Sequence, residues 1–230
     1  ASYFLHRGHE RVFEFELARA FARSIGCRLQ IVLPPDGNQL IPWLLEGRGD
    51  LVAASMTIRP SREDWASFST PYIEPREVIV ARADDLSVNS LQDLAGRTVH
   101  IRRSSSYFDA LSGLDKAYGF TLDLLPPDLE TEEIIARVAG GEFDLTAADE
   151  HIVGIELAYR DDIRKAFPLG PPRAIGWAMR KEDTALLEAA NAFLHKQKGS
   201  TFFNVLRKKY FRDESRIRRE IPERDATRAR

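Results

Sequence analysis

The chain has 230 residues, of which 43% are hydrophobic and 30% charged, a balance typical of a globular protein. A formal net charge of −2 argues against a nucleic-acid-binding surface, which needs a marked basic excess. No apolar run approaches the ~20 residues of a membrane span. Cys27 is the only cysteine, which excludes an intramolecular disulfide and a metal site built on several thiolates.

The first third of the chain alternates between two hydrophobic periods. Apolar residues recur every four positions from Phe13 to Ile25, which predicts an amphipathic helix that Gly26 ends. A second helix is expected at 39–46. Short apolar runs bounded by turn residues predict strands at 28–33, 50–54 and 77–81. Cys27, at the end of the first helix, is expected to be a small buried apolar residue.

The remainder of the chain repeats this alternation. Helices are expected at 91–96, after the serines 104–106, and at 131–139, 184–198 and 201–210. Strands are expected at 98–101, 143–148, 163–169 and 175–179. Helices that alternate with short apolar strands predict α/β layers built on a largely parallel sheet.

An internal repeat indicates two similar halves. Gly47–Ser55 aligns with Gly141–Asp149 at five identical positions of nine, and each copy follows a predicted helix. Two related α/β lobes explain the match, although a single helix–glycine–strand unit can produce one of this length by chance. In two lobes, Ser55 and Asp149 would lie just past the carboxyl ends of two strands, where open α/β sheets bind ligands.

The stretches Gly47–Arg62 and Phe68–Tyr72 resemble the family 3 extracellular solute-binding proteins, the amino-acid-binding receptors of ABC importers. The resemblance is nearest to the non-catalytic N-terminal domain of membrane-bound lytic transglycosylase F, and it runs from Tyr3 to about Phe211. It implies an α/β fold of the two-lobed type II periplasmic binding protein class. Each lobe would be a mainly parallel sheet flanked by helices, with a hinge between the lobes.

The polar connector at Ala83–Asp85 and the turn at Pro171–Pro172 are the expected crossing points between the lobes and give their limits. Lobe 1 is expected at 1–83 and 173–211, lobe 2 at 84–172, and a charged tail or linker at 212–230. Hinge bending is expected near Ala83 and Pro171. Two departures from the family stand out: its first strand would precede Ala1, and Ser104 occupies a position where it usually has glycine.

The family's binding residues can be carried over to lobe 1 first. Arg62 would hold a ligand carboxylate, because a planar guanidinium can donate two parallel hydrogen bonds to it. Ser55 and Thr57 would add hydroxyl groups beside it. Tyr3 or Phe4 would stack on the ligand side chain. Each also has a plain structural interpretation, as a surface arginine, a strand-end hydroxyl or a packed aromatic residue.

Lobe 2 would supply the other half of the clamp. Ser105 and Ser106 would offer backbone N–H groups to an anion, a role compatible with ordinary helix capping. Asp149 would accept the ligand ammonium group; the alternative is a solvated loop aspartate. The resulting ligand class is a zwitterion.

These residues predict a periplasmic, non-catalytic domain that clamps an amino acid or a short, peptidoglycan-derived peptide. It would serve an ABC permease as a receptor, or regulate a downstream lysozyme-like domain in a full-length protein associated with the outer membrane. No cofactor, metal, nucleic acid or membrane span is expected. Two alternatives are open: an enzyme similar to cyclohexadienyl dehydratase, with Glu150 or Asp149 as general acid, and a degenerate domain used for protein contacts.

Overall fold

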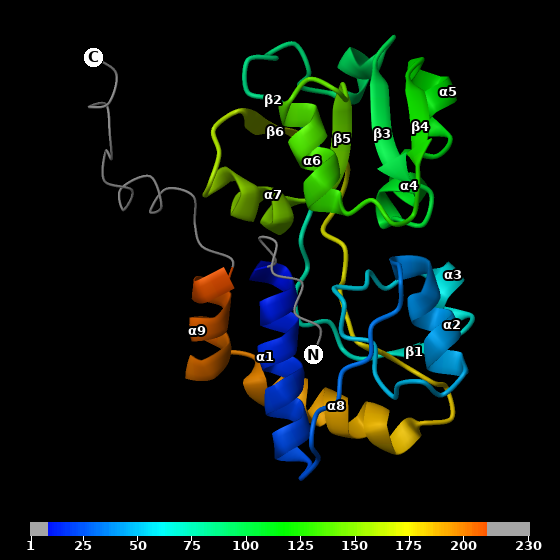
Figure 1. Ribbon diagram of the computed structural model, residues 1–230, viewed down its shortest axis with the longest axis vertical. Coiled ribbons are helices and arrows are strands. Elements are labelled where there is room, and N and C mark those ends of the chain that lie inside the picture. The colour runs from blue at the N-terminus through cyan, green and yellow to red at the C-terminus, as the bar shows by residue number, and fades with distance from the viewer. Residues whose placement is uncertain (1–8, 211–230) are drawn as a thin grey trace.

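The computed structural model describes residues 9–210, which form two lobes stacked along the long axis of the molecule (Figure 1). Lobe 1, the lower one, contains helices α1 (His9–Ser24), α2 (Leu40–Leu45), α3 (Pro60–Glu63), α8 (Thr184–Gln197) and α9 (Thr201–Tyr210), and strands β1 (Ser67–Phe68) and β7 (Ala178–Met179). None of the helices in the described range is long and apolar enough to span a membrane.

Lobe 2 is a five-stranded sheet covered by short helices. Its strands are β2 (Glu77–Arg82), β3 (Thr98–Arg102), β4 (Thr121–Leu125), β5 (Leu145–Asp149) and β6 (Ile163–Pro168). Its helices are α4 (Ser106–Leu111), α5 (Leu114–Tyr118), α6 (Thr131–Ala139) and α7 (Glu150–Leu157). The 3₁₀ turns η1 (Gly37–Gln39) and η2 (Leu91–Leu94) belong to lobes 1 and 2 respectively.

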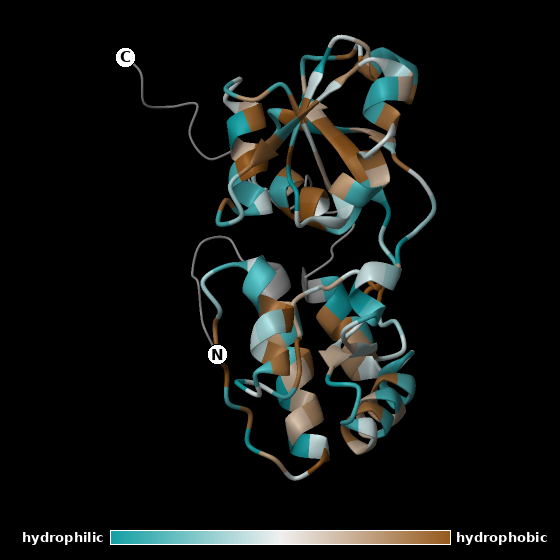
Figure 2. Cartoon of the chain, turned by 90° about the vertical axis from the view of Figure 1, so that its right-hand side faces the viewer, coloured by the Kyte–Doolittle hydropathy of each residue, from teal (hydrophilic) through white to brown (hydrophobic). Residues whose placement is uncertain are grey.

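The strand order in lobe 2 is β4-β3-β5-β2-β6. β3 pairs in parallel with β4 and β5, whereas β2 runs antiparallel to both β5 and β6. The apolar residues of β2, Ile79 to Ala81, are fully buried, as are Val99 and Leu145. These short apolar strands form the centre of the lobe 2 core, seen in brown in Figure 2.

Because β2 lies inside this sheet, the lobe boundary expected at residue 83 is wrong: the chain enters lobe 2 before Glu77. It returns through the segment that contains Pro171. The two crossing segments, 70–76 and 169–175, run side by side, with the Tyr72 N–H donating to Ile175 O over 3.1 Å. We propose lobe limits of 9–72 with 176–210, and 77–168.

The core of lobe 1 is built on α1. Phe13, Leu17 and Phe21 are buried on one face of the helix, which confirms the four-residue period of the sequence. The ring of Phe21 lies 5.4 Å from the rings of both Trp177 and Phe193. This contact fixes α1 against α8 and against the chain that follows the second crossing segment.

Two expected strands of lobe 1 do not form. Residues 28–33 pair with no strand of the described chain, and Val32 and Leu33 are 42% and 40% exposed. Within 50–54, only Val52 forms a bridge, to Ala178. An apolar run becomes a strand only where a neighbouring backbone satisfies its N–H and C=O groups. Cys27, expected to be buried, is exposed.

The internal repeat has a shared local structure. Each copy opens with a glycine in the left-handed region, Gly47 (φ 73°) and Gly141 (φ 74°). Three residues later each copy has an aspartate that pairs with an arginine: Asp50 with Arg180 over 2.8 Å and Asp144 with Arg97 over 2.6 Å. The identical positions therefore encode the same turn and the same ion pair after a helix.

Asp85 lies in the turn after β2, and the contribution of its charge to the stability of lobe 2 can be tested. The Ser87 hydroxyl donates to it over 2.6 Å and Arg97 over 2.6 Å. The hydrogen bond from the Ser87 hydroxyl makes the largest contribution, and together with Arg97 it lowers the pKa of Asp85 from 3.8 to about 2. Because the folded pKa lies below the unfolded one, this stabilisation is complete above pH ~4 and is lost as the pH falls to about 2.

We therefore expect Asp85→Asn to lower the free energy of unfolding by about 1–2 kcal/mol at neutral pH, and by much less near pH 2.5. Urea unfolding at both pH values measures the difference. Asp161→Asn, at an exposed position of the same lobe, is the control. A loss that is equal at the two pH values would show that the charge of Asp85 contributes nothing.

Candidate ligand site between the lobes

Arg62 lies where the two lobes meet. It is carried by α3, a single turn that Pro60 initiates with its fixed φ after the extended Arg59. The Arg62 guanidinium donates from Nη1 to Thr57 O over 2.9 Å and from Nη2 to Ser104 O over 3.4 Å. Thr57 belongs to lobe 1 and Ser104 to lobe 2, so this side chain spans the junction.

The charge of Arg62 is not matched by an ion pair of its own, because the nearby carboxylate of Asp109 pairs with Arg59. Among the described residues it forms no ion pair, and its two hydrogen-bond acceptors are neutral carbonyls. Burial, followed by the charge of Arg59, lowers the pKa of Arg62 to about 10. A guanidinium has five N–H groups, so donors remain for an anion. The site is therefore electropositive and short of one negative charge.

Arg59 connects the same two segments. Its Nη1 donates to Asp109 Oδ2 over 2.5 Å and to Ser105 O over 3.3 Å, and its Nη2 donates to Ser104 O over 3.2 Å. These bonds hold lobe 1 directly against the start of α4 in lobe 2. The sequence reasoning missed Arg59 and Asp109, although Arg59 lies inside the Gly47–Arg62 stretch that carries the family resemblance.

Thr57 and Ser106 add a second contact between the lobes. Both are buried, and the Thr57 hydroxyl donates to Ser106 Oγ over 3.3 Å. Ser105 has a different role: its N–H and its hydroxyl donate to Arg102 O, and its Oγ accepts from Phe108 N. Ser105 caps α4 as expected, and a role in ligand binding would require these bonds to break.

Asp149 ends β5 and precedes α7. It is 5% exposed, and its carboxylate accepts from the Tyr107 hydroxyl over 3.3 Å, while its own N–H donates to the Tyr107 oxygen over 3.1 Å. Tyr107 follows Ser106, so Asp149 is linked to the contact between the lobes. Tyr107 was also missed, because a tyrosine inside a helix carries no pattern that marks it.

Ser55 approaches the junction from lobe 1. Both its N–H and its hydroxyl donate to Glu14 Oε1, over 2.9 and 3.2 Å. Glu14 is a buried carboxylate on α1 that sequence reasoning missed, although an acid between Phe13 and Phe15 is a visible signal. Tyr3, predicted to stack on the ligand, lies outside the described residues.

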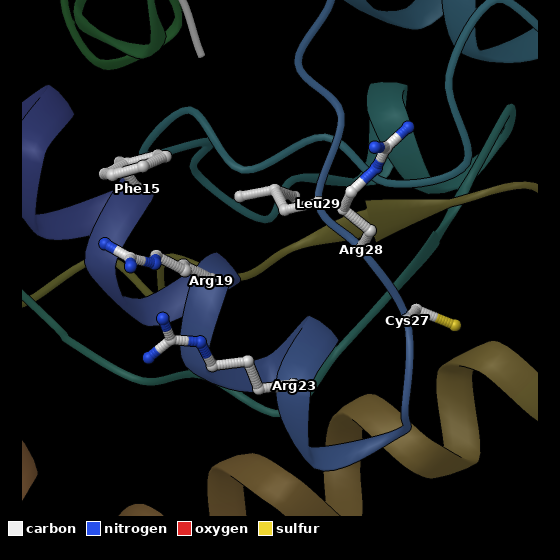
Figure 3. A pocket seen from close by; sticks show the side chains of 6 residues that line it. All are labelled: Phe15, Arg19, Arg23, Cys27, Arg28 and Leu29. Atoms are coloured by element: carbon white, nitrogen blue, oxygen red, sulfur yellow. The ribbon is translucent and has the colours of Figure 1, made fainter.

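A separate cavity of about 350 Å³ lies between α1 and residues 27–29 (Figure 3). It is lined by Phe15, Arg19, Arg23, Cys27, Arg28 and Leu29. None of the predicted ligand residues lines it, so it is not the predicted site. In the described range, no three His, Cys, Asp or Glu side chains lie close enough together to hold a metal.

With this geometry, the chain can be compared with known proteins. Residues 7–213 match the model of the bacterial extracellular solute-binding proteins, family 3. A membrane-bound lytic murein transglycosylase F from Desulfosudis oleivorans is 37% identical over 211 residues, which cover 91% of this chain and 46% of that protein. The chain thus spans about half the length of the curated relatives it matches.

Solved structures of amino-acid-binding proteins are similar in fold. A mutant of ArgBP from T. maritima is 29% identical, covers 87% of this chain and 85% of its own, and has a TM-score of 0.76. An ancestral arginine-binding protein bound to arginine is 26% identical, with coverages of 86% and 87% and a TM-score of 0.76. An ancestral amino-acid-binding protein described as a precursor of cyclohexadienyl dehydratase, at 24% identity, coverages of 86% and 84% and a TM-score of 0.75, shows the fold alone.

The Arg59–Asp109 pair should bias the molecule toward the closed arrangement. Asp109 is 42% exposed, so the pair is worth no more than ~1 kcal/mol and shifts an equilibrium at most about fivefold. We expect Asp109→Ala to raise the ligand-free radius of gyration in small-angle scattering, and added salt to have the same effect on the unmodified protein. Asp128→Ala is the control. A radius that neither change alters would show that the pair does not hold the lobes together.

Proposed function

The chain belongs to the bacterial extracellular solute-binding proteins of family 3, and we propose that it is a non-catalytic domain that closes on an amino acid or a short peptide. Binding, and not catalysis, is the activity that the site favours. The contacts between the lobes consist of hydrogen-bond donors, carbonyl groups and one ion pair.

One observation carries this proposal: Arg62 is a largely buried cation between the lobes that forms no ion pair among the described residues, and the nearby carboxylate of Asp109 is already paired with Arg59. A buried charge is costly unless an opposite charge accompanies it. A ligand carboxylate would supply that charge and accept two parallel hydrogen bonds from the guanidinium. We therefore assign the carboxylate of the ligand to Arg62, with the Thr57 and Ser106 hydroxyl groups beside it.

The second pole of the ligand is assigned to lobe 2. Arg59 already pairs with Asp109, so its charge is neutralised within the protein. Asp149, buried beside Tyr107 at the end of β5, is the carboxylate proposed to receive the ligand ammonium group. A zwitterion matches a cation on one lobe and a carboxylate on the other. The arginine bound to an ancestral relative supports this ligand class.

Similarity to lytic transglycosylase F proteins supports a cell-wall context for the domain. Lytic transglycosylase F proteins match the chain over about half their own length. We propose that the chain is the binding half of such a periplasmic protein, and that it responds to an amino acid or peptide released from peptidoglycan. An importer receptor would have the same site. A permease that co-purifies with the full-length protein would favour the importer over the regulatory module.

The enzymatic alternative has less support. Glu150, one of its two candidate acids, accepts from the Arg76 N–H over 3.3 Å at the first crossing segment. Asp149, the other, is engaged with Tyr107. No described feature favours either residue as a proton donor.

Removal of the guanidinium tests the site. We expect Arg62→Ala to lower the affinity for L-arginine or L-glutamine at least a hundredfold in calorimetry, because an unpaired ligand carboxylate costs roughly 3–5 kcal/mol. The affinity of Arg62→Lys should lie between those of the unmodified protein and Arg62→Ala, since an ammonium group keeps the charge but cannot donate two parallel hydrogen bonds. Arg207→Ala, on the exposed side of α9, should bind normally. Near-native binding by Arg62→Ala would place the site elsewhere.

The ligand class can be tested by thermal stabilisation. Free amino acids or short cell-wall peptides should stabilise the protein by ~2.7 kcal/mol at a hundredfold excess over the dissociation constant. Their amides and N-acetyl derivatives should do much less, since each leaves one buried charge without a partner. Sugars, nucleotides and simple dicarboxylates should have no effect. Stabilisation by an uncharged sugar but by no zwitterion would contradict the proposed function.

A further inference from the structure

Glu14 is the centre of a buried hydrogen-bond cluster in lobe 1. It lies on α1 with 3% of its surface exposed. Its Oε1 accepts from the N–H and hydroxyl of Ser55 and from the Tyr72 hydroxyl, and its Oε2 accepts from Trp177 Nε1 over 3.0 Å. A carboxylate is suited to this position, because the four groups named here all donate to it.

Ser55 needs such a partner because its backbone is unusual. Among the described residues, it is the only non-glycine with a positive φ, at 47°. The left-handed region is disfavoured for residues with a Cβ atom and persists where the surroundings enforce it. Glu14 takes both donors of Ser55, its N–H and its hydroxyl, with one oxygen atom.

The direction of the chain at Ser55 affects the site directly. Thr57 follows two residues later, and its carbonyl accepts from Arg62. If residue 55 relaxed to an extended conformation, the chain that leads to Thr57 would leave in another direction. The hydroxyl of Ser55 would also lose its bond to Glu14.

The other two donors connect Glu14 to the hinge. Tyr72 stands at the start of the first crossing segment, and Trp177 follows the second. Glu14 thus joins α1, the turn at Ser55 and the lobe 1 ends of both crossing segments. One carboxylate fixes the turn that leads to Arg62 relative to the axis about which the lobes move.

We propose that Glu14 is a positioning residue for ligand binding: it holds Ser55 in the left-handed conformation and thereby aligns Thr57 and Arg62, without touching the ligand. The predicted effect on ligand binding rests on the proposed function. The predicted effect on the conformation of Ser55 does not.

The decisive variant is Glu14→Gln, which keeps the size and turns one acceptor into a donor that faces donors. We expect it to weaken L-arginine binding about ten- to a hundredfold in calorimetry at a temperature where it stays folded. Ser55→Gly should rescue the geometry, because glycine adopts a positive φ without a partner. The double variant should therefore bind no more weakly than Ser55→Gly alone. Glu188→Gln, on the exposed face of α8, is the matched control.

A readout without ligand separates this inference from the proposed function. In the unmodified protein the Ser55 amide should be protected from hydrogen exchange by its bond to Glu14, and Glu14→Gln should remove that protection while Ile79 in lobe 2 stays protected. If no zwitterion binds the unmodified protein, the proposed function fails, and exchange at Ser55 still decides whether Glu14 holds the turn.

Two results would overturn the inference. One is binding by Glu14→Gln within twofold of Glu188→Gln after loss of protection at Ser55, since Glu14 would then be structural only. The other is a Ser55 amide that stays protected in Glu14→Gln. If Glu14→Gln does not fold, Glu14→Asp, which keeps the charge but is one methylene shorter, carries the same expectations.

Discussion

The unbalanced charge of Arg62 is the constraint on which the rest of the site depends. Its two carbonyl acceptors fix the direction of the guanidinium but cannot neutralise it. Burial in the described arrangement lowers the pKa of Arg62 to about 10, so its charge is costly there. In the proposed function, an anion between the lobes offsets that cost more in a closed state than in an open one. That difference would couple ligand binding to closure.

The connections between the lobes are compatible with such coupling because they are few and weak. The two crossing segments pair through a few backbone bonds, and the direct contacts are a half-exposed ion pair, one hydroxyl pair and donations to backbone carbonyls. In the described range the two lobes share no apolar core: lobe 2 has one buried cluster and lobe 1 has two. A closed state held by a few polar contacts can be shifted by a small ligand, whereas a common core would fix it.

The sequence predicted those parts of the structure that depend on local patterns. The buried face of α1 followed from its four-residue period, and Ser105 from its position before a helix. Residues 28–33 were predicted as a strand and are not, since an apolar run cannot show whether a partner strand lies beside it. The strand at 77–81 was predicted and forms, but it was assigned to lobe 1, because its apolar run does not show which sheet it joins. Arg62 came from a family resemblance, while Glu14, Arg59 and Tyr107 needed contacts over 41 or more positions of sequence.

The two halves of the site differ in how far they are organised before closure. Arg62 donates to Thr57 O inside its own lobe over 2.9 Å, and to Ser104 O across the junction over a longer 3.4 Å. The first bond does not depend on closure, so the guanidinium stays directed at the site when the lobes part. Glu14 holds the turn at Ser55 through bonds that also lie within lobe 1. In the proposed function, lobe 1 is therefore the preorganised half that would receive the carboxylate first, at little entropic cost. Lobe 2, with Asp149 bonded to Tyr107, would then close on a ligand whose orientation is already set.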